Sequence, residues 1–341
     1  MSFSLKGVFS KLIAVRKSSS EAYFDVLDGW RGLSILFVLA THLLPLGPKD
    51  WKFNLTFGHL GMSLFFTLSG FLITNFLLHR PNVYCFLVRR FLRIIPLAYL
   101  YIFIAFSILH IDPKLYFPHL LFFSNWPPMF LAPGTSHFWS LCVEMQFYVG
   151  IALLFLAFKE RAFYLSIVLC VFVTIFRVYN GVHVAINTYY RIDEVLVGVI
   201  LAMVYNKKLG DKILMVLGSV NAYLIFLALF ISCHPNSGFM NYLRPYFAAM
   251  LVATSLFSTK DTYLKSFLKT RVLVYIASIS YALYVIHPLL THTWLGSGEV
   301  FEKYSKRPLL FIVLFLLAHL STFYYEKRWI SLAKRVTSRY R

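Results

Sequence analysis

Charge is scarce in this sequence, and acidic charge is the scarcest. Only 14% of the 341 residues are charged, with 14 Asp and Glu against 33 Lys and Arg, whereas ordinary soluble domains contain about 25% charged residues. Hydrophobic residues make up 59% of the chain, and the mean hydropathy is +0.69. So few charges cannot cover a water-facing surface on a chain of this length. The composition therefore excludes an ordinary soluble globular protein and predicts a surface that faces lipid.

Cysteine is also rare, and no CxxC motif is present. The four cysteines are Cys85, Cys142, Cys170 and Cys233, and their spacing predicts neither a disulfide framework nor a zinc site. We therefore expect no metal. The first 27 residues lack the uninterrupted apolar core of a cleavable signal, so residues 1–27 are predicted to form a basic cytoplasmic arm.

Apolar stretches recur along the chain from residue 30 onward. They cover residues 30–46, 57–78, 94–110, 138–158, 162–179, 190–205, 213–232, 240–258, 272–296 and 308–325. Most are long enough to cross a hydrocarbon core of about 30 Å as a helix. Segment 111–137 holds five prolines and is predicted to be a re-entrant or interfacial outer segment. The predicted fold class is an all-α integral membrane protein with about ten transmembrane helices.

The basic residues predict the orientation of these spans. If the N-terminus is cytoplasmic and ten spans alternate, 23 Lys and Arg fall on the cytoplasmic side, seven fall on the outer side and three lie within spans. One of the seven outer residues lies in the loop 233–245. This is the positive-inside bias, so both termini are predicted to be cytoplasmic. We expect one membrane domain, 28–326, and a basic cytoplasmic tail, 327–341. Anionic lipid headgroups account for the charge, and no nucleic-acid partner is expected.

Ionisable side chains inside the predicted spans are candidates for function, because they are costly in lipid. Arg31 and His42 lie eleven residues apart on the first span, about 16 Å of helix rise, and roughly on one face. Each alone has a structural reading, as a snorkelling arginine or a hydrogen-bonded core histidine. Together they indicate a polar track through the membrane. Near its cytoplasmic end, the cluster of Arg89, Arg90 and Arg93 suits phosphate groups, although positive-inside charges alone also explain it.

Other polar residues gather in the predicted outer half of the membrane. They are Glu144, Arg191, Asp193, Tyr281, Tyr284 and His287. Glu144 lies about 9 Å below the outer surface by helix rise and needs a partner such as a histidine or a substrate hydroxyl. Arg191 and Asp193 either serve the substrate or form an ion pair with each other. An aromatic belt explains the tyrosines but not His287.

At these residues the sequence resembles the membrane-bound acyltransferase-3 family, whose members acylate extracytoplasmic carbohydrates. The resemblance runs from about Tyr23 to Glu326. Its marks are Arg31 with ten residues before His42, HLGMSLFFTLSGFLIT (59–74), the Arg90-x-x-Arg93 pair, FWSLCVEMQFY (138–148), RIDEVLVG (191–198) and SYALYVIHP (280–288). The usual WSLSVEEQFY carries Cys142 and Met145 here, so only Glu144 retains the acidic role. We expect no appended esterase-like domain of the kind that some relatives carry, and this favours direct transfer from the membrane domain to the acceptor.

The resemblance implies transfer of an acyl group, most often acetyl, from cytoplasmic acyl-CoA to a sugar hydroxyl across a bacterial cytoplasmic (inner) membrane. Arg31, Arg90 and Arg93 would hold the CoA phosphates. His42 would be catalytic, either accepting the acyl group or acting as general base, with Glu144 orienting it or binding the acceptor. Ser69 would donate to an oxyanion or serve helix packing with Gly70. The supporting residues are Ser69, Trp139, Ser140, Arg191, Asp193, Tyr281 and His287.

The implied partners are acyl-CoA as co-substrate, a carbohydrate or glycolipid acceptor and membrane lipids, without a permanently bound cofactor. The acceptor is a lipopolysaccharide O-antigen, an exopolysaccharide, peptidoglycan or a glycosylated lipid, and a longer donor such as succinyl-CoA stays open. The main alternative is a transporter or lipid-carrier flippase, although no internal repeat of the kind found in many transporters is visible. A third possibility is a non-catalytic relative that acts as a scaffold.

Overall fold

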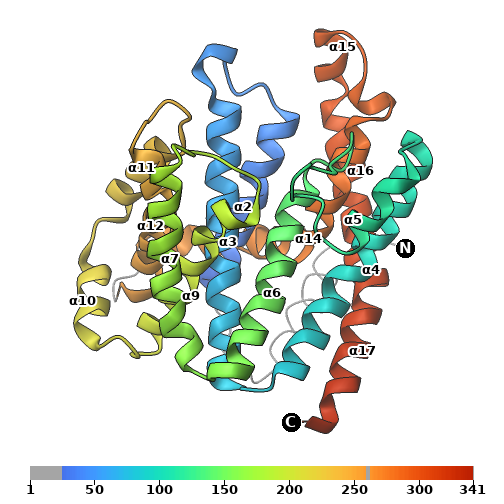
Figure 1. Ribbon diagram of the computed structural model, residues 1–341. Helices are drawn as coiled ribbons and strands as arrows, with labels where there is room; N and C mark the ends of the chain where they lie inside the picture. Colours follow the sequence, from blue (N-terminus) through green and yellow to red (C-terminus); the bar gives the residue numbers. More distant parts are fainter. Residues whose placement is uncertain (1–24, 259–261, 341) are drawn as a thin grey trace, which may run out of the picture.

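The computed structural model describes residues 25–258 and 262–340, and its regular elements within these ranges are all helical (Figure 1). The longer α-helices are α2 (Asp25–Leu43), α3 (Phe53–His79), α4 (Val83–Leu109), α6 (Phe138–Phe158), α7 (Arg161–Tyr179), α12 (Met240–Phe257), α14 (Arg271–Thr291) and α16 (Arg307–Leu320). The shorter ones are α5 (Tyr116–Leu120), α8 (Thr188–Arg191), α9 (Asp193–Tyr205), α10 (Asp211–Ser219), α11 (Ala222–Cys233), α13 (Tyr263–Leu268), α15 (Val300–Ser305) and α17 (Lys327–Thr337). Residues 1–24 of the predicted arm 1–27 lie outside the described residues.

Fewer helices meet the requirements of a membrane span than the ten predicted. Among the described residues, seven are long and apolar enough, and the count reaches eight if α10 and α11, bent by 85° at their junction, form one span. The difference lies in three predicted stretches, 190–205, 213–232 and 240–258. Helix α9 has only 13 residues, short of the roughly 20 needed to cross a bilayer. Helix α12 opens with polar residues, including the buried Arg244 that was predicted to lie in an outer loop.

Helix α3 lies at the centre of the bundle, between α2 on one side and α9 on the other (Figure 1). The α3–α9 contact depends on two glycines. A Cβ added to Gly70 would lie 2.0 Å from the Val195 carbonyl oxygen, and one added to Gly198 would lie 2.1 Å from the Thr67 carbonyl oxygen. Small residues that let two backbones approach this closely are typical of membrane helix contacts.

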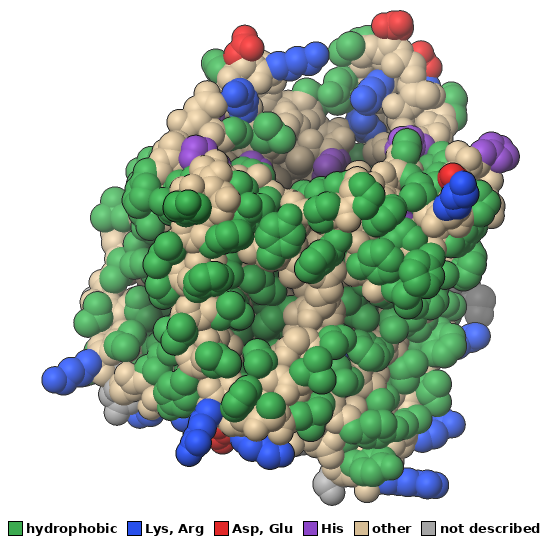
Figure 2. Space-filling model, in the orientation of Figure 1, with side chains coloured by type: hydrophobic (Ala, Val, Ile, Leu, Met, Phe, Trp, Pro, Cys, Tyr) green, Lys and Arg blue, Asp and Glu red, His purple; other side chains and the backbone are tan. Residues whose placement is uncertain are grey.

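The surface is divided by residue type as a membrane protein requires. Figure 2 shows a band of hydrophobic side chains around the molecule, Lys and Arg gathered at its lower end, and charged and histidine side chains at its upper end. The upper end is hollowed between two protruding lobes, and histidines show at this hollow. Large apolar side chains such as Leu153, Val168 and Ile312 are more than 60% exposed, which in a bilayer places them against lipid.

Segment 111–137 is not a spanning helix, as predicted from its prolines. It contains a short 3-10 helix (Pro113–Leu115), α5 and a series of turns. Its buried polar side chains have partners within the protein: the His119 Nε2 atom lies 2.9 Å from the Thr135 Oγ1 atom, and the Asn125 amide donates to the Ile186 carbonyl oxygen at 2.9 Å. These bonds satisfy polar groups that lipid would leave unpaired.

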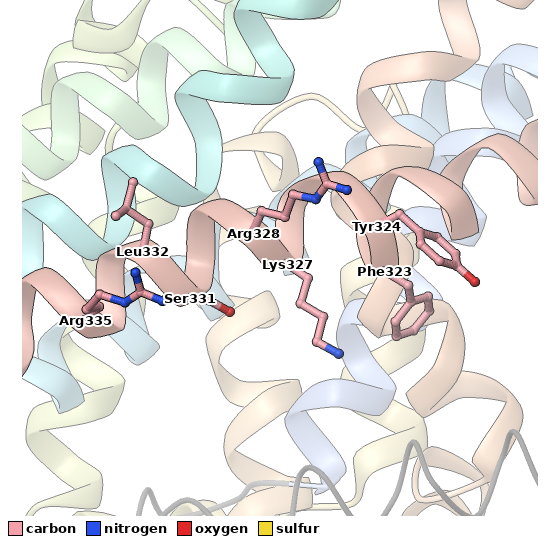
Figure 3. A pocket seen from close by; sticks show the side chains of 7 residues that line it. All are labelled: Phe323, Tyr324, Lys327, Arg328, Ser331, Leu332 and Arg335. Atoms are coloured by element: carbon pink, nitrogen blue, oxygen red, sulfur yellow. The ribbon is translucent and has the colours of Figure 1, made fainter.

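The last helix is continuous but changes its winding near the end. Helix α16 passes through a π-helical segment, Ser321–Glu326, into α17. A groove of about 560 Å³ runs along this part (Figure 3). It is lined by Phe323, Tyr324, Lys327, Arg328, Ser331, Leu332 and Arg335. Lys327 and Arg328 leave the helix in different directions. Basic side chains therefore spread over more than one side of the helix, and such a surface attracts anionic lipid headgroups.

Candidate active site

Two histidines meet where α2 ends and α14 nears its end. His42, in the last turn of α2, is exposed, and its ring centroid lies 5.2 Å from that of the buried His287. The His287 Nδ1 atom lies 2.8 Å from the Tyr284 carbonyl oxygen and 3.2 Å from that of Leu283. Because a carbonyl oxygen only accepts, Nδ1 carries the proton in this arrangement. The Nε2 atom of His287 is therefore the acceptor, as it would be in a side chain that orients a second imidazole.

A third histidine, which the sequence analysis did not single out, completes this group. His137 directly precedes α6, and its ring centroid lies 5.6 Å from that of His287 and 5.4 Å from that of Tyr284. The Tyr284 hydroxyl donates to the His137 carbonyl oxygen at 2.7 Å and is hydrogen-bonded to Ser140. We call His42, His137, Ser140, Tyr284 and His287 the histidine cluster. The signal was available, since His137 is the residue before the FWSL motif.

Glu144 lies deeper on α6 than this cluster. It is buried, and its Oε1 atom accepts hydrogen bonds from the Ser69 hydroxyl at 2.8 Å and from the Tyr148 hydroxyl. The predicted partnership of Glu144 with His42 is therefore not what the structure shows. Seven residues of helix separate Glu144 from His137, about 10 Å of rise. Ser69 binds this carboxylate, while its neighbour Gly70 makes the close helix contact.

The predicted phosphate-binding arginines come together beside Glu144. Arg31 lies within electrostatic range of Arg90, Arg93 and Glu144, and the Arg90 guanidinium lies 6.0 Å from the centre of the Tyr148 ring. We call Arg31, Arg90 and Arg93 the arginine cluster. Three carboxylates are near these arginines: Asp28 pairs with Arg31 at 4.0 Å, and Glu144 and Glu326 lie within electrostatic range of Arg31 and Arg93, respectively. The guanidinium groups nonetheless supply the donors that an anionic ligand needs.

Arg89 and Tyr281 lie beside the arginine cluster, but their side chains bind other parts of the protein. The Arg89 Nε atom donates to the Thr337 hydroxyl of α17 at 3.0 Å, so this arginine holds the last helix. The Tyr281 hydroxyl donates to the Ile94 carbonyl oxygen at 2.6 Å and lies within electrostatic range of Glu144 and Arg93. Tyr281 therefore lies along the path between the two clusters.

Arg191 and Asp193 do not pair with each other, so the predicted ion pair between these two residues is wrong. Arg191 pairs with Glu194 at 3.2 Å, Asp193 pairs with Arg177, and Glu194 also accepts from Arg244 at 2.8 Å. All five side chains are at most 2% exposed. We call them the buried ion network. It joins α7, α8, α9 and α12, so its evident role is structural.

Trp139 connects this network to the site. The Arg191 guanidinium lies 5.2 Å from the centre of the Trp139 ring, which also contacts Phe66 of α3 at 5.8 Å between centroids. A cation over an indole face is attracted by the ring quadrupole. Trp139 is followed by Ser140 of the histidine cluster, so the network fixes the first turn of α6, from which that cluster is partly built.

The site is thus a cationic cluster and an imidazole cluster joined through the bundle by a hydrogen-bonded carboxylate. No group of three or more His, Cys, Asp or Glu within the described residues has a geometry that would hold a metal ion. The available chemistry is anion binding at the arginine cluster and proton transfer or nucleophilic attack at the histidine cluster.

Comparison with known proteins connects this geometry to a family. A protein of Staphylococcus aureus (strain COL) that is provisionally named an O-acetyltransferase is 26% identical over 335 aligned residues, covering 83% of this chain and 54% of the relative. The provisionally named peptidoglycan O-acetyltransferase YrhL of Bacillus subtilis (strain 168) is 30% identical, covering 56% of this chain and 35% of the relative. The peptidoglycan O-acetyltransferase OatA of Listeria monocytogenes is 31% identical, covering 38% and 24%.

The chain spans about half the length of the Staphylococcus aureus relative and less of the other two. No solved structure matches it. The family model of the acyltransferase domain, by contrast, matches residues 24–326, a range that contains both the arginine cluster and the histidine cluster. The protein therefore belongs to the acyltransferase-3 family.

Proposed function

We propose that this protein is a membrane O-acyltransferase, most specifically an O-acetyltransferase. It moves an acetyl group from cytoplasmic acetyl-CoA to a hydroxyl of an extracytoplasmic carbohydrate, in the cytoplasmic (inner) membrane of a bacterium. Family membership supports the acyl transfer, and the names of the relatives support the acetyl group and a cell-wall carbohydrate acceptor. The donor is inferred from the arginine cluster.

The observation that carries the proposal is the placement of the two clusters along α2. Arg31 lies within electrostatic range of Arg90 and Arg93 near one end of this helix, and His42 faces His287 at the other. Guanidinium groups bind phosphates through paired hydrogen bonds, so the arginine cluster suits the phosphate-rich end of CoA. The thioester would then reach the histidine cluster about 16 Å away along the helix axis.

The chemistry follows from the histidine cluster. His42 takes the proton of the acceptor hydroxyl as that oxygen attacks the thioester carbonyl carbon. The tetrahedral intermediate collapses with cleavage of the C–S bond, and the CoA thiolate takes the proton back from the imidazolium. His287, with its Nδ1–H bound to backbone carbonyls, supplies an acceptor that orients His42. In an alternative course the His42 imidazole attacks the thioester carbonyl carbon and the C–S bond breaks to release the CoA thiolate. The acceptor hydroxyl then attacks the acetyl carbon, the imidazole leaves, and the hydroxyl proton ends on the thiolate.

Glu144 acts on the donor side in this proposal. Its hydrogen bonds from Ser69 and Tyr148 fix it beside Arg31, where it reduces the mutual repulsion of the arginine cluster. This replaces the expected role of Glu144 as the group that orients His42.

The test is transfer of radiolabel from acetyl-CoA to a membrane glycan fraction. His42→Ala should abolish labelling, because removal of a general base or nucleophile costs about 10²-fold or more. The matched control is His79→Ala, since His79 is exposed at the far end of α3 and its loss should leave labelling unchanged.

Two results would contradict the proposal. Equal labelling by the wild type and the His42→Ala variant would show that His42 is structural. Absence of label with the wild type across acceptor fractions, together with failure of CoA to raise the melting temperature, would favour the transporter alternative, because a ligand that binds the folded state stabilises it.

A further inference from the structure

The buried ion network carries an excess of positive charge. It contains three guanidiniums, of Arg177, Arg191 and Arg244, and two carboxylates, of Asp193 and Glu194. Within the part of the chain that the structure describes, no other carboxylate lies within 4.0 Å of these arginines. One positive charge is therefore uncompensated in the bundle, where an unpaired charge costs several kcal/mol, by general estimates of burial.

The excess is localised at Arg244. Its Nε atom donates to Glu194 at 2.8 Å, but neither the NH1 nor the NH2 nitrogen has a hydrogen-bond partner among the described residues. The residue is fully buried. Arg177 differs, because its two terminal nitrogens bind Asp193 and the His183 carbonyl oxygen. Arg191 also has one buried nitrogen, Nε, without a hydrogen-bond partner among the described residues, but its guanidinium lies over the Trp139 ring.

The surroundings of Arg244 indicate how an ion would reach it. His59 of α3 lies within electrostatic range of Arg244 and is only half-buried, and its Nδ1 atom is hydrogen-bonded to the Cys233 carbonyl oxygen at 2.9 Å. Cys233 also lies within electrostatic range of Arg244. The free guanidinium edge therefore lies near the contact of α3 with the end of α11, which is followed by the half-buried His234.

We propose that a monatomic anion, chloride under ordinary conditions, binds the NH1 and NH2 groups of Arg244 and neutralises the buried ion network. A halide supplies the single negative charge that the network lacks and accepts from two N–H groups at once. Arg244 is fully buried, so an ion bound there would be enclosed by the protein. This inference does not depend on the acyltransfer reaction.

The competing occupant is an internal water. The Asn241 Oδ1 atom, one helical turn before Arg244, is also buried without a hydrogen-bond partner, and a water could bridge it to the guanidinium. A water would satisfy hydrogen bonds but would leave the charge uncompensated, so the two occupants predict different responses to halide concentration.

The test is the melting temperature of the purified protein in detergent as chloride replaces gluconate at constant ionic strength. For the wild type we expect a saturable rise of a few degrees, and the same with bromide, because a ligand that binds only the folded state stabilises it. Arg244→Lys, which keeps the charge toward Glu194 but removes the two terminal nitrogens, should lose this rise. Arg161→Gln, at an exposed arginine, should keep it.

Three outcomes would overturn the proposal. The wild type melting at the same temperature in both salts would leave water as the occupant, and an equal rise in Arg244→Lys would place the halide elsewhere. If Arg244→Lys fails to fold, crystals of the wild type grown in bromide provide the second measurement. An anomalous peak beside Arg244 supports the site, and its absence there contradicts it.

Discussion

The proposed role of His287 depends on a single atom, its Nε2 nitrogen. Its Nδ1–H is held by the carbonyl oxygens of Tyr284 and Leu283, so Nε2 is left to act on His42. His287→Asn places an amide nitrogen near the Nδ1 position and removes Nε2. We expect the variant to fold and its transfer rate to fall about tenfold or more, with a changed pH dependence, because the partner that orients the general base is lost. The measurement is the pH profile of acetyl transfer. An unchanged profile would assign His287 to packing alone.

Glu144 is expected to behave differently, because it lies on the donor side. Glu144→Gln keeps an oxygen that accepts from Ser69 and Tyr148 but removes the charge beside Arg31. We expect the KM for acetyl-CoA to change by about tenfold, the size of one charge-assisted hydrogen bond. The midpoint of the pH profile, which His42 sets, should stay the same. Initial rates at varied acetyl-CoA and pH check this. A shift of the midpoint instead would return Glu144 to the role of orienting His42.

At this scale the sequence grouped Arg31 with Arg90 and Arg93, which lie within electrostatic range of Arg31 in the structure, but it misassigned the partners of two acids. Arg191 and Asp193 are two residues apart, and side chains at that spacing on a helix do not face each other, whereas Arg191 and Glu194 are three apart and do. This was available from the sequence. The distance of Glu144 from the histidine cluster was not, because it depends on how α6 meets α3 at Ser69 and α14 at Tyr284.

Between elements, the α3–α9 contact is the most sensitive to added volume. Gly70→Ala would bring a Cβ within 2.0 Å of a backbone oxygen that cannot move alone, so α3 and α9 must separate. We expect destabilisation of about 1–3 kcal/mol, the usual cost of overpacking, and a lower melting temperature. Gly150→Ala in α6 is the matched control, since nothing lies within 4 Å of its added Cβ. Equal melting temperatures for the two variants would show that α9 is not held as described.

The buried ion network should be worth far more than an exposed pair. Glu194→Gln removes the partner of both Arg191 and Arg244 and leaves their charges buried, at a cost of about 3–5 kcal/mol. Glu160→Gln breaks the pair with Lys208; the two side chains are 53% and 40% exposed, respectively, and the loss of stability should be much smaller because water screens the pair. Thermal unfolding of both variants in the same detergent compares them. Similar losses would show that the network is not what joins α7, α9 and α12.

Helix positions followed from hydropathy more reliably than helix breaks did. The stretch 213–232 was predicted as one helix, but it divides into α10 and α11. The Asn221 side chain accepts from the backbone N–H groups of Tyr223 and Leu224, which caps a new helix at that point. The sequence Gly218-Ser219-Val220-Asn221 carried this signal, but an average over hydrophobic residues hides a cap within an apolar run.

For the whole molecule, orientation is the property on which the proposed direction of transfer depends. Lys and Arg line the lower end of the hydrophobic band, whereas the upper end carries both basic and acidic side chains, with histidines at its hollow (Figure 2). If the positive-inside rule holds, the arginine cluster opens toward cytoplasmic acyl-CoA and the histidine cluster toward the extracytoplasmic acceptor. The opposite orientation would present the arginines to a compartment without CoA.

Cysteine labelling in intact cells tests this orientation with little background, because the four native cysteines are all buried and free. Ser297 lies in the loop between α14 and α15 and Ser338 follows α17, and both are exposed. A membrane-impermeant maleimide should label Ser297→Cys in intact cells and Ser338→Cys only after the membrane is opened. Labelling of Ser338→Cys alone from outside would invert the topology. Labelling of both from outside would mean that the helix from Arg307 to Tyr340 does not cross the membrane, although it contains a stretch apolar enough to do so.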